Sequence, residues 1–270
     1  MATQLEVPKM GASIDFARGL FQRGTECFGL DEITKVFGAS LAPAIDQVPR
    51  IPFTEEELKR ARELGQFLVL CGPVSMAEMH KVLDNKLAEG RFLYDTGWYQ
   101  GESFYLQEKT GWHWRLTTRE VIPGSTGQNY LQQTKTLATY LTDQVYAGQE
   151  LPSIYAEAIA ELDRREAELK KLMDTDWQRA AEELAGLALN HLCRETPTQV
   201  LQSVALSKCI NHEYPLSDRW TWTLVRSAGG CLVCVGDADS DGVHVGRGSP
   251  GFSSDYLGVR FSRSVQSLIC

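Results

Sequence analysis

Leu257-Gly-Val-Arg-Phe-Ser262, near the carboxyl end of the 270-residue chain, alternates apolar residues with others. Successive side chains of a β-strand point to opposite faces. Leu257, Val259 and Phe261 are therefore expected to share one face, with Arg260 on the other. This pattern is typical of a sheet that has one packed face and one face in water. The stretch predicts a terminal β-structure in which Arg260 faces solvent.

The residues before this stretch have the same β character. Short runs rich in β-branched and aromatic residues lie at 220–225, 231–235 and 243–245. From Arg219 to the end the chain holds eight Gly and eight Ser, but no Lys, Glu, Asn or Met. A glycine-rich β region is expected to be poor in Lys and Glu, although the complete absence of both is unusual for a window of this length.

The rest of the chain is expected to be mostly helical. Thr54-Glu-Glu-Glu57 forms a capping box, which predicts a helix from there to Gly65. A buried strand is expected at 66–71, and aromatic β-type runs at 91–94, 104–106 and 112–117. Hydrophobic periodicity and cap residues predict the other helices at about 12–22, 30–37, 75–88, 128–146, 152–173, 175–193 and 197–208. We therefore expect an α+β protein.

Composition excludes several classes of protein. The chain is 43% hydrophobic and 9% aromatic, so disorder is not expected. No apolar run approaches the length of a membrane span. A net charge of −8 argues against nucleic acid as a partner. Seven scattered cysteines and the absence of a visible signal peptide indicate thiols in a reducing compartment, and we expect a cytoplasmic protein.

Two short motifs suggest calcium or nucleotide binding, and each is incomplete. Asp237-x-Asp239-x-Asp241-Gly242 resembles the start of a calcium loop, but the twelfth position is Gly248 where a bidentate Glu is needed. A solvated acidic turn is the favoured interpretation, and calcium stays a weak option. Gly246-x-Gly248-x-x-Gly251 fits a dinucleotide pattern, but no helix is expected after it.

Cysteine and histidine spacing gives no better site. Cys231-x-x-Cys234 resembles half of a zinc site, yet residues three apart in a strand point to opposite faces. Cys209-x-x-His212 could supply two ligands at a helix end. The sequence has neither a His-x-x-x-His pair nor a Gly-x-Ser-x-Gly elbow. We expect no metal, no cofactor and no catalytic residues.

Three stretches resemble the variable proteins of diversity-generating retroelements. They are 220–223, 236–245 and 257–264, and Gly258-Val-Arg-Phe-Ser-Arg263 matches the G-hydrophobic-R-hydrophobic-x-R ending typical of that family. The segments 51–58 and 114–130 also resemble a branch of these proteins from uncultured microbes. In such systems a reverse transcriptase copies a template, mutates the copy at adenines and overwrites the end of the target gene. The targets end in a C-type-lectin fold of the formylglycine-generating-enzyme subtype.

The resemblance implies a domain division and a cause for the missing residues. Residues 1–65 would be a mainly helical segment, and 66–270 a C-type-lectin-like domain with a helical insertion at about 128–212 and a variable region at about 219–264. Adenine mutagenesis of an AAY codon cannot produce Lys, Glu, Gln, Met or Trp. It readily produces Gly, Ser, Asp, Arg, Cys, His, Tyr and Leu, which fill the tail.

The implied function is ligand binding through exchangeable side chains on a rigid scaffold. The partner would be a macromolecule, expected to be a protein, with no role for nucleic acid or membrane insertion. By analogy and strand alternation, the outward positions are Leu224, Arg226, Cys231, Cys234, Asp237, His244, Gly246, Arg247, Gly251, Ser254, Asp255, Tyr256 and Arg260.

Two alternatives remain open. Related enzymes of this fold oxidise a substrate cysteine with a C-terminal cysteine pair, for which Cys231 and Cys234 are the candidates. Alternatively, the chain could be a structural or phage-type receptor-binding protein whose surface is not diversified. Lectin-like domains of this kind sometimes bind calcium, which keeps Asp237, Asp239 and Asp241 under consideration.

Overall fold

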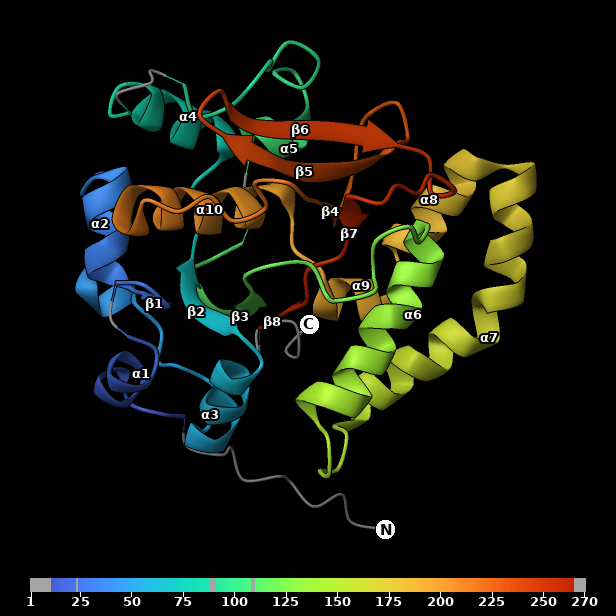
Figure 1. The fold of residues 1–270 in the computed structure, drawn as a ribbon, viewed down its shortest axis with the longest axis horizontal. Coiled ribbons are helices and arrows are strands. Elements are labelled where there is room, and N and C mark those ends of the chain that lie inside the picture. Colours follow the sequence, from blue (N-terminus) through green and yellow to red (C-terminus); the bar gives the residue numbers. More distant parts are fainter. Residues whose placement is uncertain (1–10, 23, 88–90, 108–109, 265–270) are drawn as a thin grey trace.

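The structure is a computed structural model that describes residues 11–22, 24–87, 91–107 and 110–264. Within these ranges the protein is a mixed α+β structure with two four-stranded sheets. The strand orders are β1-β2-β3-β8 in the first sheet and β6-β5-β4-β7 in the second. Figure 1 places the second sheet above the first, with α10 between them. The expected fold class, α+β, is confirmed.

The first sheet combines residues from both ends of the chain. Its strands are β1 (Cys27–Phe28), β2 (Gln66–Cys71), β3 (His113–Thr118) and β8 (Ser262–Arg263). β1 runs parallel to β2, whereas the other two pairs are antiparallel. The strands predicted at 66–71 and 112–117 are thereby confirmed.

The second sheet is built from the glycine-rich tail. It contains β4 (Trp220–Arg226), β5 (Leu232–Asp239), β6 (Gly242–Gly248) and β7 (Leu257–Gly258). β4, β5 and β6 form an antiparallel meander, and β7 pairs with β4 in parallel. The strands predicted at 220–225, 231–235 and 243–245 are confirmed, with longer boundaries for β5 and β6.

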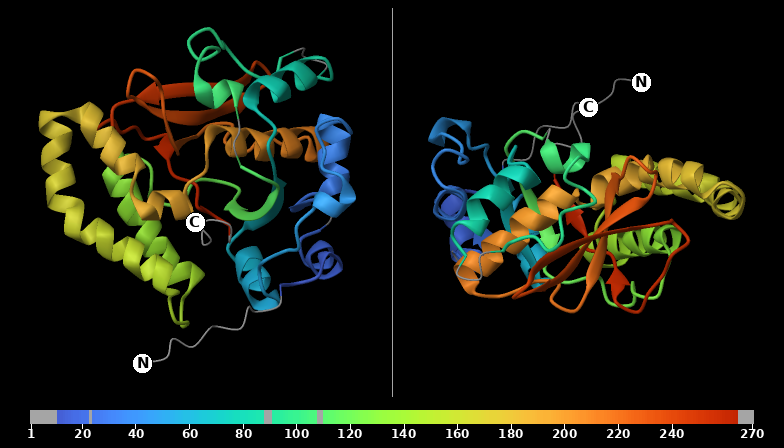
Figure 2. Two further views of the ribbon diagram at one scale, coloured as in Figure 1. Left: turned by 180° about the vertical axis from the view of Figure 1, so that it is seen from behind. Right: turned by 90° about the horizontal axis from the view of Figure 1, so that it is seen from above.

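The helices form two groups. The first group lies in the first half of the chain and consists of α1 (Ile14–Leu20), α2 (Leu30–Phe37), η1 (Ile45–Gln47), α3 (Glu55–Glu63), α4 (Met76–Asp84) and α5 (Ser103–Leu106). The second group precedes the tail and consists of α6 (Tyr130–Tyr140), η2 (Leu141–Val145), α7 (Ser153–Thr175), α8 (Trp177–Ala185), α9 (Ala188–Cys193) and α10 (Pro197–Asn211). Figure 2 shows α7 at the periphery in both additional views.

Local capping explains two helix starts that the sequence predicts. The backbone amide of Thr54 donates to Glu57 Oε2 at 2.8 Å, and the amide of Glu57 donates back to Thr54 Oγ1 at 3.2 Å. Ser75 and Glu78 repeat this arrangement at the start of α4. Each box satisfies amides that have no partner within the helix. Gly65 follows α3 with φ +65°, as expected for a glycine beyond a helix end.

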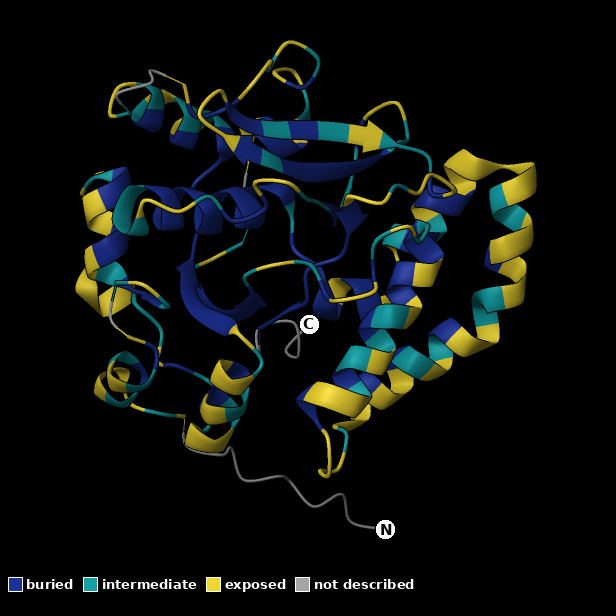
Figure 3. Ribbon diagram, in the orientation of Figure 1, coloured by how far each residue is buried: buried dark blue, intermediate teal, exposed yellow. Residues whose placement is uncertain are grey.

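The second sheet is covered on both faces. On one face Val233 and Val245 join an apolar cluster with Val204 of α10 and Phe67 of β2. On the other face Trp222 and Leu232 pack with residues of α6–α9, such as Tyr130 and Leu162. Figure 3 shows that most of β5 and of α10 is buried, whereas exposed positions gather on the loops that flank β6 and on α7. Tail positions that reach solvent lie in these loops, at some positions of β6, and near the ends of β4 and β5.

The first 65 residues also pack onto the first sheet. Phe21 and Phe53 share an apolar cluster with Leu68 of β2 and Leu116 of β3. β1 contributes the edge strand beside β2. The division of the chain at residue 65 stays a prediction.

Four predicted elements are wrong. In the β-type run predicted at 91–94, the structure has an isolated bridge from Leu93 to Val243 in place of a strand. Residues 104–106 belong to α5, because Phe104 and Tyr105 pack in a helical turn against Tyr99. The helix predicted at 175–193 is interrupted between α8 and α9. The single strand predicted at 257–262 is divided into β7 and β8, which belong to different sheets.

Candidate functional site

The tail positions predicted to face outward mostly reach the surface. Eleven of the thirteen are exposed or half-buried, and we call these the tail surface: Leu224, Arg226, Cys231, Asp237, His244, Gly246, Arg247, Gly251, Ser254, Asp255 and Tyr256. Tyr256 is among the most exposed large side chains of the described residues, with 59% of its surface accessible. The remaining two, Cys234 and Arg260, are buried.

The prediction that Arg260 faces solvent is wrong. Its guanidinium is 1% exposed and donates to the Thr118 carbonyl oxygen at 2.7 Å and to Ser203 Oγ at 3.1 Å. Its Nε lies 3.6 Å from Glu195 Oε2. A guanidinium can be buried when its donors and its charge find partners. The alternation of apolar residues places Arg260 on the face opposite to Val259 and Phe261, but both faces of this segment are buried.

Cys234 is the second incorrect surface position. It lies in the middle of β5, opposite Gly246 on one side and Trp222 on the other. Burial raises the pKa of its thiol to about 12. Cys231 precedes the strand and is half-buried. The two cysteines therefore differ sharply in access to solvent.

The tail surface does not lie on a single face of the sheet. Residues directly opposite each other across strands share a face, so the pairing of His244 with Gly236 and of Gly236 with Trp220 places these three together. Arg247 pairs with Val233 and belongs to the other face. The set is instead spread over the outer strand β6, the loops beside it, the end of β4 (Leu224 and Arg226) and one position of β5, Asp237.

The connection between β6 and β7 carries the most exposed part of the tail surface. Gly251, Asp255 and Tyr256 are exposed there, and Ser254 is half-buried. The Tyr256 carbonyl oxygen accepts a hydrogen bond from the Trp220 amide at 2.7 Å, which fixes this loop to the start of β4. The loop is thus anchored at its base while its side chains remain accessible.

The end of the sheet where Arg226, Leu232 and Gly248 pair lies against α8. Arg226 is half-buried and its Nη2 lies 3.4 Å from Glu182 Oε1. The amide of Leu224 donates to the Glu195 carbonyl oxygen at 2.9 Å. Leu224, Arg226 and Cys231 are therefore separated along the strands from His244 and Asp237, which lie near the opposite turn.

Sequence reasoning missed Phe252, Tyr94 and Trp98. Phe252 is 53% exposed in the β6–β7 connection. The ring of Tyr94 stacks on His244 with 4.1 Å between centroids, and the Arg247 guanidinium lies 4.6 Å from the centroid of Trp98. A lone Phe within a Gly- and Ser-rich stretch was the available signal for Phe252. No local pattern could place Tyr94 and Trp98, because they reach the tail only through tertiary structure.

Space limits which tail positions can vary. A Cβ at Gly246 would lie 3.0 Å from both Cys234 Sγ and the Trp220 ring, whereas the nearest atom to a Cβ at Gly251 is Met173 Cε at 4.0 Å. A Cβ at Gly236 would overlap the Arg219 carbonyl oxygen. Side chains are therefore accommodated easily at Gly251, with local adjustment at Gly246, and not at Gly236.

The acidic motif forms the turn between β5 and β6. Asp239 and Asp241 are exposed, and Asp239 Oδ1 accepts a hydrogen bond from the Asp241 amide at 2.7 Å. Asp237 is half-buried with φ +49°. Among the described residues, no group of three or more His, Cys, Asp or Glu side chains is arranged to hold a metal ion. The carboxylates of Asp239 and Asp241 thus lie in an exposed turn.

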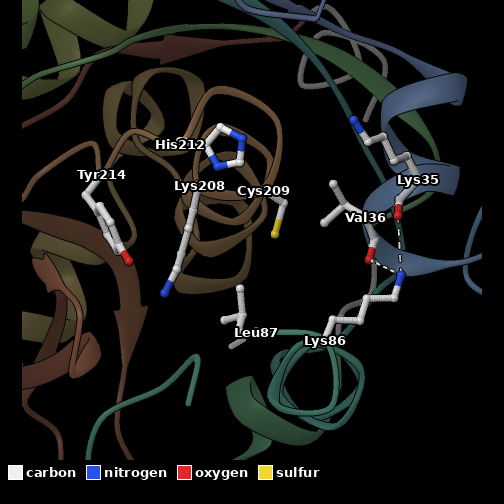
Figure 4. A pocket seen from close by; sticks show the side chains of 8 residues that line it. All are labelled: Lys35, Val36, Lys86, Leu87, Lys208, Cys209, His212 and Tyr214. Carbon is white, nitrogen blue, oxygen red and sulfur yellow. Dashed lines mark hydrogen bonds between the residues drawn. The ribbon is translucent and has the colours of Figure 1, made fainter. Parts of the chain in front are cut away.

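Three cavities in the described part of the chain differ in their linings, and one of them reaches Tyr94, whose ring stacks on His244. One, of about 450 Å³, is lined by Lys35, Val36, Lys86, Leu87, Lys208, Cys209, His212 and Tyr214. Figure 4 shows that Lys86 points to the end of α2, where its Nζ donates to the Val36 carbonyl oxygen at 2.7 Å. A lysine at a helix carboxyl end satisfies carbonyls that lack partners. Lys86 therefore has a structural role at the carboxyl end of α2.

The other two cavities differ in character. A cleft of about 1010 Å³ lies between residues 119–124 and α6, and burial raises the pKa of the Glu120 carboxyl there, which the nearby Arg260 guanidinium opposes. A polar cavity of about 420 Å³ includes His80, Asp84 and Tyr94. His80 Nε2 lies 2.9 Å from Asp84 Oδ2. None of these three cavities is lined by a residue of the tail surface.

Comparisons of the chain with protein families, curated proteins and solved structures give no match. Among the described residues, no helix has the length and apolar character needed to cross a membrane. The functional assignment therefore depends on the residues and their geometry alone.

Proposed function

We propose that the chain is a ligand-binding protein whose C-terminal surface is diversified by a diversity-generating retroelement. In this proposal the two sheets and their helices form a C-type-lectin-like domain of the formylglycine-generating-enzyme subtype. Residues 219–264 are the variable region. Binding occurs through exchangeable side chains, without bond-making chemistry.

One observation carries the proposal. Every residue from Thr223 to Ser264 is of a type encoded by codons that end in a pyrimidine, and the first excluded type is Gln266. Mutation of AAY codons at their adenines reaches only these types. Within this stretch the structure has exposed residues at Arg247 and in the loops that follow β5 and β6, and buried residues at 232–236 and 257–264. The stretch thus combines a coding restriction with many solvent-facing positions.

The buried residues of the tail provide the scaffold that such a surface needs. Arg263 Nη1 donates to Glu57 Oε1 and to the Tyr146 hydroxyl, both at 2.9 Å. A Cβ at Gly258 would lie 2.7 Å from Ser125 Oγ. Together with Arg260, these residues of the terminal motif depend on partners elsewhere in the chain. Binding residues are commonly displayed on loops positioned by a rigid framework.

The neighbouring DNA tests the proposal. A gene for a reverse transcriptase and a second, nearly identical copy of the 3′ end of this gene are expected close by. Mismatches between the two copies should fall opposite adenines of the template copy. Absence of both the reverse-transcriptase gene and the repeat would contradict the proposal, and would favour an undiversified receptor-binding protein.

The oxidase alternative has less support. An oxidising cysteine pair needs accessible thiols that form thiolates. Burial raises the pKa of Cys234 to about 12, so its thiol is protonated at neutral pH. The oxidase would lose turnover in Cys231→Ser or Cys234→Ser, and unchanged turnover in both variants would remove this alternative.

A further inference from the structure

A constant segment outside the tail is attached to the outer edge of β6. The amide of Val243 donates to the Phe92 carbonyl oxygen at 2.8 Å, and the amide of Tyr94 donates to the Val243 carbonyl oxygen at 3.0 Å. Further along, Trp98 Nε1 donates to the Val245 carbonyl oxygen at 3.1 Å. Residues 92–98 thus accompany the edge strand on which His244 and Arg247 lie.

Two aromatic rings of this segment lie against tail-surface side chains. Tyr94 and His244 are stacked, with 15° between their planes, and Tyr94 is 38% exposed. On the opposite face of β6, the Arg247 guanidinium lies over Trp98. Trp98 in turn packs edge-on against Tyr99, which is buried in the core. Each of these two β6 side chains therefore contacts an aromatic ring that the proposed diversification would not change.

An aromatic ring suits a neighbour whose identity changes. Its face attracts a guanidinium or other cation, stacks with His, Tyr or Phe, and packs against aliphatic groups. All of these side chains are available from a mutated AAY codon. A constant ring beside a variable position can therefore order many different side chains without being specific for one of them.

We propose that Tyr94 and Trp98 are constant residues of the binding surface and that its partner is a folded protein. This inference rests on the function proposed above and adds two residues and a partner class to it. The partner class follows from the chemistry of the exposed side chains. The tail surface lines none of the three cavities described above, but Tyr94 lines the polar one, so the cavities do not decide the partner. Exposed aromatic residues and arginine, here Phe252, Tyr256 and Arg247, are the types that dominate protein–protein binding energy.

A display library of the full chain tests this inference. The library carries NNY codons, those ending in a pyrimidine, at His244, Arg247, Phe252, Asp255 and Tyr256, and is selected for binding to lysozyme as the probe protein. Tyr94→Ala is then introduced into each binder. We expect dissociation constants to rise about 10-fold, as for loss of an aromatic contact near the centre of an interface. Tyr94→Phe, which keeps the ring, should change them less than about threefold.

Matched variants separate the possible failures. Ile14→Ala removes a side chain that is 37% exposed, nearly as much as Tyr94, but lies on α1 at the far side of the molecule, and it should leave affinity unchanged. Trp98→Leu keeps apolar volume without the ring, and should weaken binders that retain Arg247 about fivefold. Its folding is checked by circular dichroism, and Tyr94→Ala alone decides the inference if Trp98→Leu does not fold.

Three results would overturn the inference. Binders that tolerate Tyr94→Ala as well as Ile14→Ala contradict the role of the constant segment while leaving the proposed function intact. A library that yields no binder contradicts the proposed function and this inference with it. Saturable binding of the unaltered chain to sugars on a glycan array would contradict the protein partner.

Discussion

Arg260 Nε donates a hydrogen bond to the Thr118 carbonyl oxygen at 2.7 Å, joining the terminal motif to β3. The same residue reaches β4, because its amide donates to Thr221 Oγ1 at 3.0 Å, and reaches α10 through Ser203. Arg260 therefore connects both sheets and the helix between them. A surface whose side chains are exchanged needs buried contacts of this kind elsewhere in the tail, because the exchanged side chains cannot be relied on to stabilise the fold.

Arg260→Ala should destabilise the protein by about 3–5 kcal/mol, because it leaves buried Glu195 without its positive partner. Arg247→Ala is the matched control, since this arginine of the same tail is exposed and lies over Trp98. Arg247→Ala should lower the free energy of unfolding by no more than about 1 kcal/mol. Urea unfolding measures both free energies. Equal losses for the two variants would contradict the anchoring role of Arg260.

Gly236→Ala should destabilise the protein by about 3 kcal/mol, because the added Cβ would overlap the Arg219 carbonyl oxygen in the adjoining strand. Gly251→Ala adds the same group where the nearest atom is 4.0 Å away, and should change stability by less than about 0.5 kcal/mol. Thermal unfolding of the two variants provides the comparison. A stable Gly236→Ala would show that β4 and β5 are less closely packed than described.

Cys231 should be alkylated by iodoacetamide in the folded protein at pH 8, whereas Cys234 should not. Burial blocks access to Cys234 and raises the pKa of its thiol to about 12, which leaves roughly one thiolate in ten thousand at this pH. Peptide mass spectrometry reports the two sites separately. Labelling of Cys234 as fast as that of Cys231, before urea is added, would place it at the surface.

Alkaline pH should destabilise the folded chain through its buried thiols. Burial raises the pKa of Cys193 and Cys234 from an ordinary value of 9.0 to about 12, so both thiols stabilise the fold fully below pH 9. That contribution is lost as pH rises from 9 towards 12, because the unfolded chain ionises first. Between pH 8 and pH 10, the free energy of unfolding should fall by about 1.4 kcal/mol less in Cys234→Ala than in the unaltered chain. Equal decreases in the free energy of unfolding of the two proteins would mean that Cys234 ionises as easily in the folded chain as in the unfolded chain.

The sequence predicts local features of this fold well and tertiary ones poorly. The capping boxes at Thr54 and Ser75 depend on residues three positions apart, and both helix starts are confirmed. The β-type run at 104–106 becomes a helical turn in which Phe104 packs against Tyr99, and Tyr105 packs against Tyr99 and the more distant His80. Propensity describes only an average environment, and tertiary packing overrides it in short segments.

The candidate site likewise combines local features, which the sequence predicts, with tertiary features, which it does not. The alternation of residue types predicts which side chains of a strand share a face. It does not predict whether that face is exposed to water or covered by a second packed layer. His244 and Arg247 are accessible because β6 is an edge strand, whereas Cys234 is covered because β5 is central. Arg260 is buried because residues 259–261 cross from one sheet to the other. These facts depend on strand order, which no local pattern contains.

The most direct measurement of the central claim is a codon-by-codon alignment of this gene with its template repeat. The account predicts mismatches opposite template adenines at codons for exposed positions such as His244, Arg247 and Tyr256. It predicts identical codons for Gly236, Gly258 and Arg260. Mismatches concentrated at those three buried positions, or scattered without regard to template adenines, would contradict a recognition surface built from replaceable side chains.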